Sequence, residues 1–228
     1  ASTRGLRCSS VFAAAGRDGG GGGSGQRHGG GQTWKTTRAK TRRPRQPPSG
    51  RGARTAMLMD EVCLLSAPKE GTEVPKLIVF DLDDTIWYPE LYMMCGAPWS
   101  RDELGRVTDA GGEELRIYPA ARESLRLILT HGAFADTRVA VASRTTQGRW
   151  AREAMALLTV VGTTTLREAA GDLCEIFPGS KKQHFEKLRA KAGVAYHEIL
   201  FFDNESGNVR EVGQLGVTSV FCPGGMSQ

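Results

Sequence analysis

Four groups of residues that could carry chemistry each follow a run of strand-forming residues. The groups are Asp81-Leu-Asp83-Asp84-Thr85, Ser143-Arg144-Thr145, Gly179-Ser180-Lys181 and Asp203-Asn204-Glu205. In open α/β sheets ligands bind at the carboxyl ends of the strands, because the loops there meet at one edge. Four polar groups at four strand ends therefore predict one shared site rather than a scatter of surface residues.

The spacing of Asp81 and Asp83 indicates a cation. Residues two apart on an extended chain project to the same face, so the two carboxylates lie close together. Nearby carboxylates repel unless a cation offsets their charge. Magnesium takes oxygen ligands, often one or two carboxylates together with a phosphate. An ordinary acidic turn could contain the same pair, but the full string Val79-Phe80-Asp-Leu-Asp-Asp-Thr85 after an apolar strand favours a Mg²⁺ and phosphate site.

Strands that alternate with helices must position these groups. Short apolar runs rich in β-formers are typical of buried strands, and apolar residues at helical spacing indicate the helices. We expect strands over 76–80, 138–142, 173–177, 198–202 and 217–221, and helices over 118–132, 146–158, 180–191 and 208–214. A capping box of Ser180 and Gln183 starts the third helix. The order predicts an α/β fold, a five-stranded parallel sheet with helices on both faces.

Four motifs together resemble a known family. They are Asp81-Leu-Asp-Asp-Thr-Ile-Trp87, Ala142-Ser-Arg-Thr145, Phe177-Pro-Gly-Ser-Lys181 with His184-Phe185, and Phe201-Phe-Asp-Asn-Glu205 with Asn208. Over residues 75 to 226 the chain is similar to the haloacid dehalogenase (HAD) superfamily, and within it to the magnesium-dependent phosphatases. The resemblance implies a Rossmann-like HAD fold, Mg²⁺ as cofactor, and hydrolysis of a phosphotyrosine protein or a small sugar phosphate.

The resemblance also implies a role for each matching residue. Asp81 would be the nucleophile that takes the phosphoryl group. Asp83 would protonate the leaving oxygen and then activate water, as a general acid and base does. Ser143 and Arg144 would bind phosphate oxygens, and Lys181 would neutralise charge on Asp81 and on the transferred group.

Two residues depart from the pattern of the subgroup. Asp84 stands where an aromatic residue is frequent, although Asp is common there in the superfamily. Asn204 stands where a second Asp is usual after Asp203. An amide oxygen still binds a hard cation. The predicted metal ligands are therefore Asp81, Asp83 and Asn204, with Asp203 acting indirectly or through water, and the lower charge would weaken Mg²⁺ binding or favour another divalent ion.

Residues 86–117 are too few and too irregular for a full cap domain. We expect a loop or small flap there, and a helix, a linker and a strand over 146–178. The site would then be open, with no large cap domain, and would admit a phosphorylated protein side chain as well as a small ester. Trp87 and Tyr88 are expected to pack over the sheet edge.

Three other functions are compatible with parts of the pattern. A non-catalytic relative that binds phosphate or protein would bind without turnover, but it has no need of Asp81, Asp83, Ser143 and Lys181 together. A receiver domain places its nucleophile on the third strand, not the first. A phosphotransferase or mutase needs a cap that excludes water from the acyl-phosphate.

The first 58 residues differ from the rest of the chain in net charge and in glycine content. Residues 1–58 hold 12 Lys and Arg against one acid, giving +11, and 13 of the 29 Gly; the remainder holds 18 bases and 24 acids, giving −6. We expect a basic leader over 1–72 and one phosphatase domain over 73–228. The leader fits a disordered segment, a transit peptide or a nucleic-acid-binding arm. The resemblance also implies that relatives continue into a helix beyond Pro223–Gln228, and we expect that a missing helix there would leave an apolar sheet face exposed.

The cysteines and the apolar stretches limit the cellular locations and binding partners that we expect for this chain. Five widely spaced cysteines without a Cys-x-x-Cys pair favour a reducing compartment over a disulfide scaffold. No apolar stretch approaches the ~20 residues that cross a bilayer. We expect a monomer that acts on a phosphorylated small molecule or a phosphoprotein, with no membrane or nucleic-acid partner. The predicted location is cytoplasmic, or the chloroplast or mitochondrion if the leader is a transit peptide.

Overall fold

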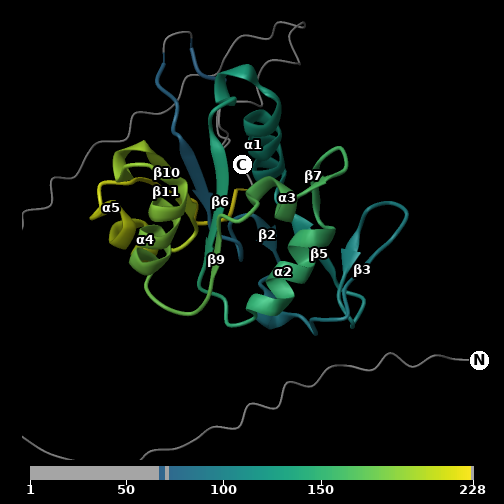
Figure 1. Cartoon of the computed structure of the whole chain (residues 1–228). Coiled ribbons are helices and arrows are strands. Elements are labelled where there is room, and N and C mark those ends of the chain that lie inside the picture. Colours follow the sequence, from purple (N-terminus) through teal and green to yellow (C-terminus); the bar gives the residue numbers. More distant parts are fainter. Residues whose placement is uncertain (1–66, 70–71, 227–228) are drawn as a thin grey trace, which may run out of the picture. The chain divides into compact units, whose positions relative to one another are not determined.

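A five-stranded parallel sheet forms the centre of the computed structural model, which describes residues 67–69 and 72–226. The strand order is β11-β10-β1-β6-β9 (Figure 1). The strands are β1 (Leu77–Phe80), β6 (Arg138–Ser143), β9 (Cys174–Ile176), β10 (Ile199–Asp203) and β11 (Thr218–Phe221). Each overlaps a predicted strand, so the predicted α/β class and the five-stranded parallel sheet are confirmed.

The central strand β1 shows why its sequence is apolar throughout. It pairs in parallel with β10 on one side and β6 on the other, and all four of its side chains are buried. Ile78 and Phe80 enter one hydrophobic cluster, while Leu77 and Val79 enter a second on the opposite face. A parallel strand covered on both faces requires a continuous apolar run rather than alternation.

Helices cover both faces of the sheet, as predicted. The helices α1 (Pro119–Thr130), α2 (Gly148–Leu157) and α3 (Leu166–Ala170) lie on one side of the sheet, and α4 (Lys181–Ala192) and α5 (Ser206–Gly213) on the other (Figure 1). The 3₁₀ turns are η1 (Leu91–Met93), η2 (Gly132–Phe134) and η3 (Tyr196–Glu198). Leu125 of α1 and Met155 of α2 pack in the first cluster, and Phe185 of α4 packs in the second.

Some predicted boundaries were wrong for local reasons. Helix α2 begins at Gly148 rather than 146, because the Ser143 and Thr145 hydroxyls accept backbone N–H groups two residues on and form turns instead. Ser180 caps α4 by accepting from Lys182 N. The reciprocal bond expected from Gln183 is not part of this cap as the structure describes it.

Residues 159–170 are not a plain linker. They form a short hairpin of β7 (Thr159–Val161) and β8 (Thr164–Thr165) that leads into α3. The capping box of α3 is made by Thr165 and Glu168. The strands are too short for a repeating pattern in the sequence to reveal them.

Residues 86–117, here called the flap, form a small antiparallel sheet. Its strands are β2 (Trp87–Tyr88), β3 (Ser100–Arg101), β4 (Val107–Thr108) and β5 (Glu114–Ile117), in the order β2-β5-β4-β3. This agrees with the expected small flap. Its root contributes buried side chains to the first cluster, among them Ile86, Trp87 and Leu91.

The last described residues fold back against the first cluster. Met226 is fully buried; its N–H donates to Thr85 O, and its carbonyl accepts from Ala120 N. The chain from β11 is thereby attached both to the loop that follows β1 and to the start of α1.

The predicted leader, 1–72, lies outside the described residues except for 67–69 and 72. In the described part of the chain, every helix is too short or too polar to cross a membrane.

Candidate active site

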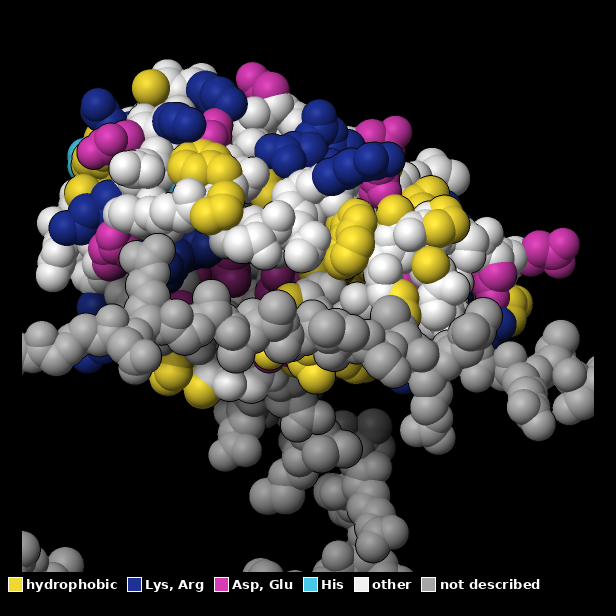
Figure 2. Space-filling view, turned by 90° about the horizontal axis from the view of Figure 1, so that it is seen from below, with side chains coloured by type: hydrophobic (Ala, Val, Ile, Leu, Met, Phe, Trp, Pro, Cys, Tyr) yellow, Lys and Arg dark blue, Asp and Glu magenta, His cyan; other side chains and the backbone are white. Residues whose placement is uncertain are grey.

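The predicted groups meet at one edge of the sheet. A pocket of about 180 Å³ is lined by residues from the ends of β1, β6 and β10 and from the flap. Figure 2 looks onto this edge and shows acidic side chains in a recess beside basic ones. The lining includes the predicted Asp81, Asp83, Ser143, Arg144 and Asn204.

Lys181 lies behind the pocket and joins two of the acids. Its side chain is fully buried, and Nζ is 2.7 Å from Asp81 Oδ1 and 3.0 Å from Asp203 Oδ2. Nζ also donates to Ala142 O at 2.5 Å. These three acceptors match the three donors of an ammonium group. Position one of α4, set by the Ser180 cap, directs this lysine to Asp81, whereas Lys182 bonds the surface residue Gln214.

Asp81 is a carboxylate in an unfavourable setting. Its exposed fraction is 7 %. Burial raises its pKa to about 7; Lys181 lowers the pKa, and Asp203 and then Asp83 raise it again. One lysine therefore does not offset the local negative charge, and a second cation would stabilise the ionised form.

Asp83 is held by the root of the flap. Its Oδ1 accepts hydrogen bonds from Trp87 Nε1 at 2.8 Å and from Leu91 N at 3.1 Å. Burial raises the pKa of Asp83, while the hydrogen bonds from Trp87, Leu91 and Thr145 lower it in part. A carboxyl group with a raised pKa retains a proton that it can give to a leaving group.

Asp203 and Asn204 differ in their surroundings. Asp203 is fully buried; its Oδ1 accepts from Glu205 N and Asn208 Nδ2, and its Oδ2 from Asn208 Nδ2 and Lys181 Nζ. Asn204 lines the pocket, and its Oδ1 accepts from Thr85 Oγ1 at 3.3 Å. Both Asp203 oxygens thus accept two hydrogen bonds each, whereas Asn204 is a lining residue of the pocket and its Oδ1 accepts one bond from Thr85.

Ser143 and Arg144, at the end of β6, also line the pocket. Ser143 is buried, with its Oγ accepting from Thr145 N at 3.3 Å. Arg144 is half-exposed, and its Nη1 donates to Asn208 Oδ1 at 3.0 Å and lies 3.8 Å from the Glu205 carboxylate. A guanidinium that is oriented but still exposed suits a phosphate oxygen.

Sequence reasoning missed several contributors. Asn208 was noted as part of a motif, without a role, yet it bonds both Asp203 and Arg144. Glu90 and Tyr92 line the pocket from the flap. The pKa of Glu90 is raised to about 7 by burial and by Asp84. The irregular sequence of the flap gives no signal for either residue, since neither lies in a motif and the 3₁₀ turn that contains Tyr92 has only three residues.

The metal-binding potential of the pocket rests on mixed oxygen donors. In the described part of the chain, no three His, Cys, Asp or Glu side chains gather into a metal cluster. A cation here would therefore combine carboxylate and amide oxygens with water or substrate oxygens, as Mg²⁺ commonly does.

Comparison with known proteins identifies the family. The model of the acid phosphatase family matches residues 73–228. The chain belongs to the acid phosphatase family. It is 34 % identical over 154 residues to magnesium-dependent phosphatase 1 of Homo sapiens, covering 68 % of this chain and 81 % of that protein. It is 35 % identical over 153 residues to a HAD-like hydrolase superfamily protein of Schizosaccharomyces pombe, covering 65 % and 86 % of the two chains.

A solved structure is similar to this acid phosphatase family member as well. It is a crystal structure of the N-terminal part of the Bacteroides fragilis protein BF1531, which contains a phosphatase domain complexed with Mg. Its TM-score is 0.47 at 15 % identity, covering 68 % of this chain and 38 % of that one. The family model and the two relatives confirm the resemblance to HAD-type magnesium-dependent phosphatases.

Proposed function

We propose that this chain is a magnesium-dependent phosphomonoester hydrolase that works through a phosphoryl group on Asp81. One observation carries the proposal: the buried Lys181 joins Asp81 to Asp203 at the floor of a pocket in which Asp83 is separately held by the flap. The two carboxyl groups of the Asp81-Leu-Asp83 motif thus have different environments. Such a division suits one nucleophile and one general acid.

The residues of the pocket fit a magnesium ion. Asp81 carries a carboxylate whose pKa is raised by burial and by neighbouring acids despite Lys181, and the Asn204 amide oxygen lies in the same pocket. Asp81 and Asn204 would bind the ion, with Asp83 beside it. Asp203, whose oxygens already accept four hydrogen bonds, would orient Lys181 and Asn208 instead. When bound, the ion would offset charge on the phosphate oxygens.

In the first step, a carboxylate oxygen of Asp81 attacks phosphorus and the bond from phosphorus to the ester oxygen breaks. Asp83 gives its proton to that oxygen, so the leaving group departs as a neutral alcohol or phenol. Lys181 stabilises the negative charge near Asp81 throughout. Ser143 and Arg144 would hold the non-reacting phosphate oxygens.

In the second step, water hydrolyses the phosphoryl group on Asp81. Asp83 is now ionised and accepts a proton from the water molecule, while the oxygen of that water attacks phosphorus. The bond to Asp81 breaks, inorganic phosphate leaves, and both carboxyl groups return to their starting states. A covalent intermediate divides one difficult displacement into two easier ones.

The substrate is proposed as a class with two members. The pocket is small, about 180 Å³, and Glu90 and Tyr92 of the flap line it. Residues 67–69 and 72–226 form no separate cap domain beside this flap. A phosphotyrosine side chain of a protein could reach the pocket, and so could a small sugar phosphate. Acid-type and protein-tyrosine phosphatase activity are both part of this proposal.

The test is phosphate release from p-nitrophenyl phosphate, a phosphotyrosine peptide and a sugar phosphate, with Mg²⁺ and with EDTA. We expect turnover that requires Mg²⁺, and a loss of about 10³-fold or more in Asp81→Asn, because the nucleophile is removed. Asp136→Asn, an exposed acid in a turn far along the chain, is the matched control and should retain full activity.

A non-catalytic phosphate-binding relative is the alternative. It predicts stoichiometric phosphate binding and no turnover of any of the three esters. Equal activity of the wild-type chain and Asp81→Asn would contradict the proposed mechanism even if phosphate were released.

A further inference from the structure

The flap is connected to the catalytic loop at one carboxyl group. Asp83 Oδ1 accepts from the indole Nε1 of Trp87 at 2.8 Å and from the backbone N of Leu91 at 3.1 Å. Both donors belong to the flap root, and both side chains, Trp87 and Leu91, are fully buried. Two directional bonds on one oxygen restrict rotation of the carboxyl group about its own bond.

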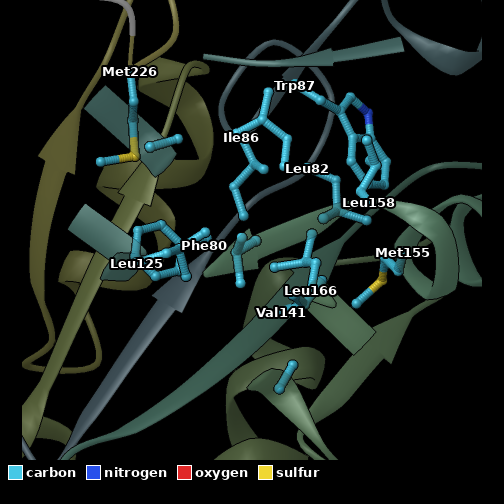
Figure 3. Close-up of a cluster of buried hydrophobic side chains, with 14 of the residues drawn as sticks. Phe80, Leu82, Ile86, Trp87, Leu125, Val141, Met155, Leu158, Leu166 and Met226 are labelled. Atoms are coloured by element: carbon cyan, nitrogen blue, oxygen red, sulfur yellow. The ribbon is translucent and has the colours of Figure 1, made fainter. Parts of the chain in front are cut away.

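The position of Trp87 is fixed by more than its ring contacts. The backbone N–H of Trp87 donates to Leu82 O, and the backbone carbonyl of Trp87 accepts from Asp84 N. It also pairs with Ile117 in the flap sheet. In Figure 3 the indole lies among the apolar side chains of the first cluster, near Leu82 and Leu158. A ring fixed by packing and by its backbone can hold its hydrogen-bond partner in one orientation.

The bonds leave the second carboxyl oxygen in a defined place. Neither Trp87 nor Leu91 bonds Asp83 Oδ2. The side chain of Thr145, which lines the pocket together with Asp83, also hydrogen-bonds this carboxyl group. Proton transfer requires the acidic oxygen to lie within hydrogen-bond distance of the leaving oxygen, and small displacements reduce the rate strongly.

We propose that Trp87 is a positioning residue for the phosphatase reaction: its indole N–H holds Asp83 Oδ1, so that Oδ2 is aimed at the leaving oxygen of the substrate. This inference rests on the proposed function, because it takes Asp83 as the general acid. It assigns to the flap root a role in proton transfer in addition to its role in packing.

A purely structural reading of Trp87 also exists. A buried indole N–H usually needs an acceptor, and Asp83 would then serve only to satisfy it. The same chain offers a comparison, because Trp99 Nε1 is buried with no hydrogen-bond partner among the described residues. Trp99→Phe removes an indole N–H that bonds no described residue, so it serves as the matched control for Trp87→Phe.

The experiment measures kcat/KM for esters whose leaving groups differ in basicity. A general acid matters most when the leaving oxygen is strongly basic, as in an alkyl phosphate, and least for 2,4-dinitrophenyl phosphate. We expect Trp87→Phe to lower kcat/KM for the alkyl ester about tenfold or more, and for the dinitrophenyl ester less than about threefold. Trp99→Phe should leave both values unchanged. A protein with benzothienylalanine at position 87 keeps the shape of the indole but lacks its N–H. It should therefore show the same selective loss as Trp87→Phe and not the wild-type values.

The outcomes separate the inference from the proposed function. Asp83→Asn should show the same selective loss, only larger. If Asp83→Asn slows both esters equally, Asp83 is not the acid, and the proposed mechanism fails there. If Asp83→Asn is selective but Trp87→Phe slows both esters equally or neither, Trp87 acts by packing and the inference is overturned. Should Trp87→Phe not fold, the benzothienylalanine protein, which keeps the ring volume, decides by the same ratio.

Discussion

Two buried aspartates, one at the catalytic edge and one in the flap, have similar exposure and opposite surroundings. Asp81 is 7 % exposed and Asp109 is 4 % exposed. The carboxylate of Asp109 accepts backbone N–H groups from Cys95, Gly111 and Glu113 at 2.6, 2.9 and 2.9 Å. Asp81 accepts from Lys181 and lies near two further acids that raise its pKa.

The difference shows that burial alone does not make a carboxylate reactive. Three backbone N–H groups donate to the Asp109 carboxylate and link the turn of the flap to Cys95. The hydrogen bonds stabilise the buried charge of Asp109, which therefore has a structural role. Asp81 keeps acceptor capacity and negative charge that its neighbours do not offset. The excess is what a cation and a phosphoryl group can use.

The largest expected contrast is between the two Asn variants in metal-free protein. Asp109→Asn replaces an acceptor oxygen by an NH₂ group that faces backbone donors, so we expect a loss of about 2 kcal/mol in the free energy of unfolding. Asp81→Asn should cost nothing or stabilise the fold, because it removes a desolvated carboxylate while Lys181 keeps Asp203 and Ala142 O as acceptors. Urea denaturation in EDTA measures both. Equal losses in the two variants would show that the Asp81 and Asp109 carboxylates stabilise the fold to the same extent, which contradicts their proposed difference.

The pH dependence of stability gives a smaller effect. In metal-free protein the pKa of Asp81 is raised from 3.8 to about 7 in the folded chain, so the folded state holds a proton that the unfolded chain releases. The stabilising contribution is therefore complete below about pH 4 and is lost as the pH rises through about 7. Between pH 5 and 8 in EDTA, wild type should lose about 1 kcal/mol or more relative to Asp81→Asn.

Magnesium supplies the control for that pH profile. On the proposed site the ion would bind the ionised Asp81 carboxylate, so added Mg²⁺ should restore stability more at pH 8 than at pH 5 in wild type, and little in Asp81→Asn. A wild-type curve parallel to that of Asp81→Asn in EDTA would show that Asp81 does not titrate in this range.

The smallest effect is expected at the tip of the flap. Leu104 is 80 % exposed, and the turn around it is held by the Asp102 carboxylate, which accepts from Leu104 N and Arg106 N. Leu104→Ser keeps those backbone bonds and should change the unfolding free energy by less than about 0.5 kcal/mol. A larger loss in the same denaturation assay would show that the Leu104 side chain packs against other residues in the folded protein.

The sequence predicted the sheet because most of its strands lie in short apolar runs, and four of these runs are followed by polar groups. The run Leu77–Phe80 is buried on both faces, which leaves a signal in every residue. The strands of the flap are two to four residues long, and two residues carry no periodicity. The turn after β4 is held by Asp109, which accepts from the backbone of Cys95, Gly111 and Glu113; the sequence around Asp109 gives no sign of these bonds.

The sequence predicted which side chains come together at this edge of the sheet, but not the contacts between them. Motif position selected Lys181 over Lys182, and the structure places Lys181 against Asp81 and Lys182 on the surface. The indole contact to Asp83 joins residues only four apart, but which way Trp87 turns depends on the packing of the whole first cluster. The links made by Asn208 needed the geometry of α5.

The attachment of Met226 to Thr85 has a consequence for the order in which the protein is made. A ribosome delivers Asp81 early, yet the adjoining loop gains its bond from the Met226 N–H only after about 140 more residues have been added. Strand β10, which lies beside β1 and ends in Asp203, also emerges late. On the proposed function, a nascent chain therefore carries the proposed nucleophile, Asp81, before β10 and Met226 are in place around it, and catalytic competence would arise only after they are added.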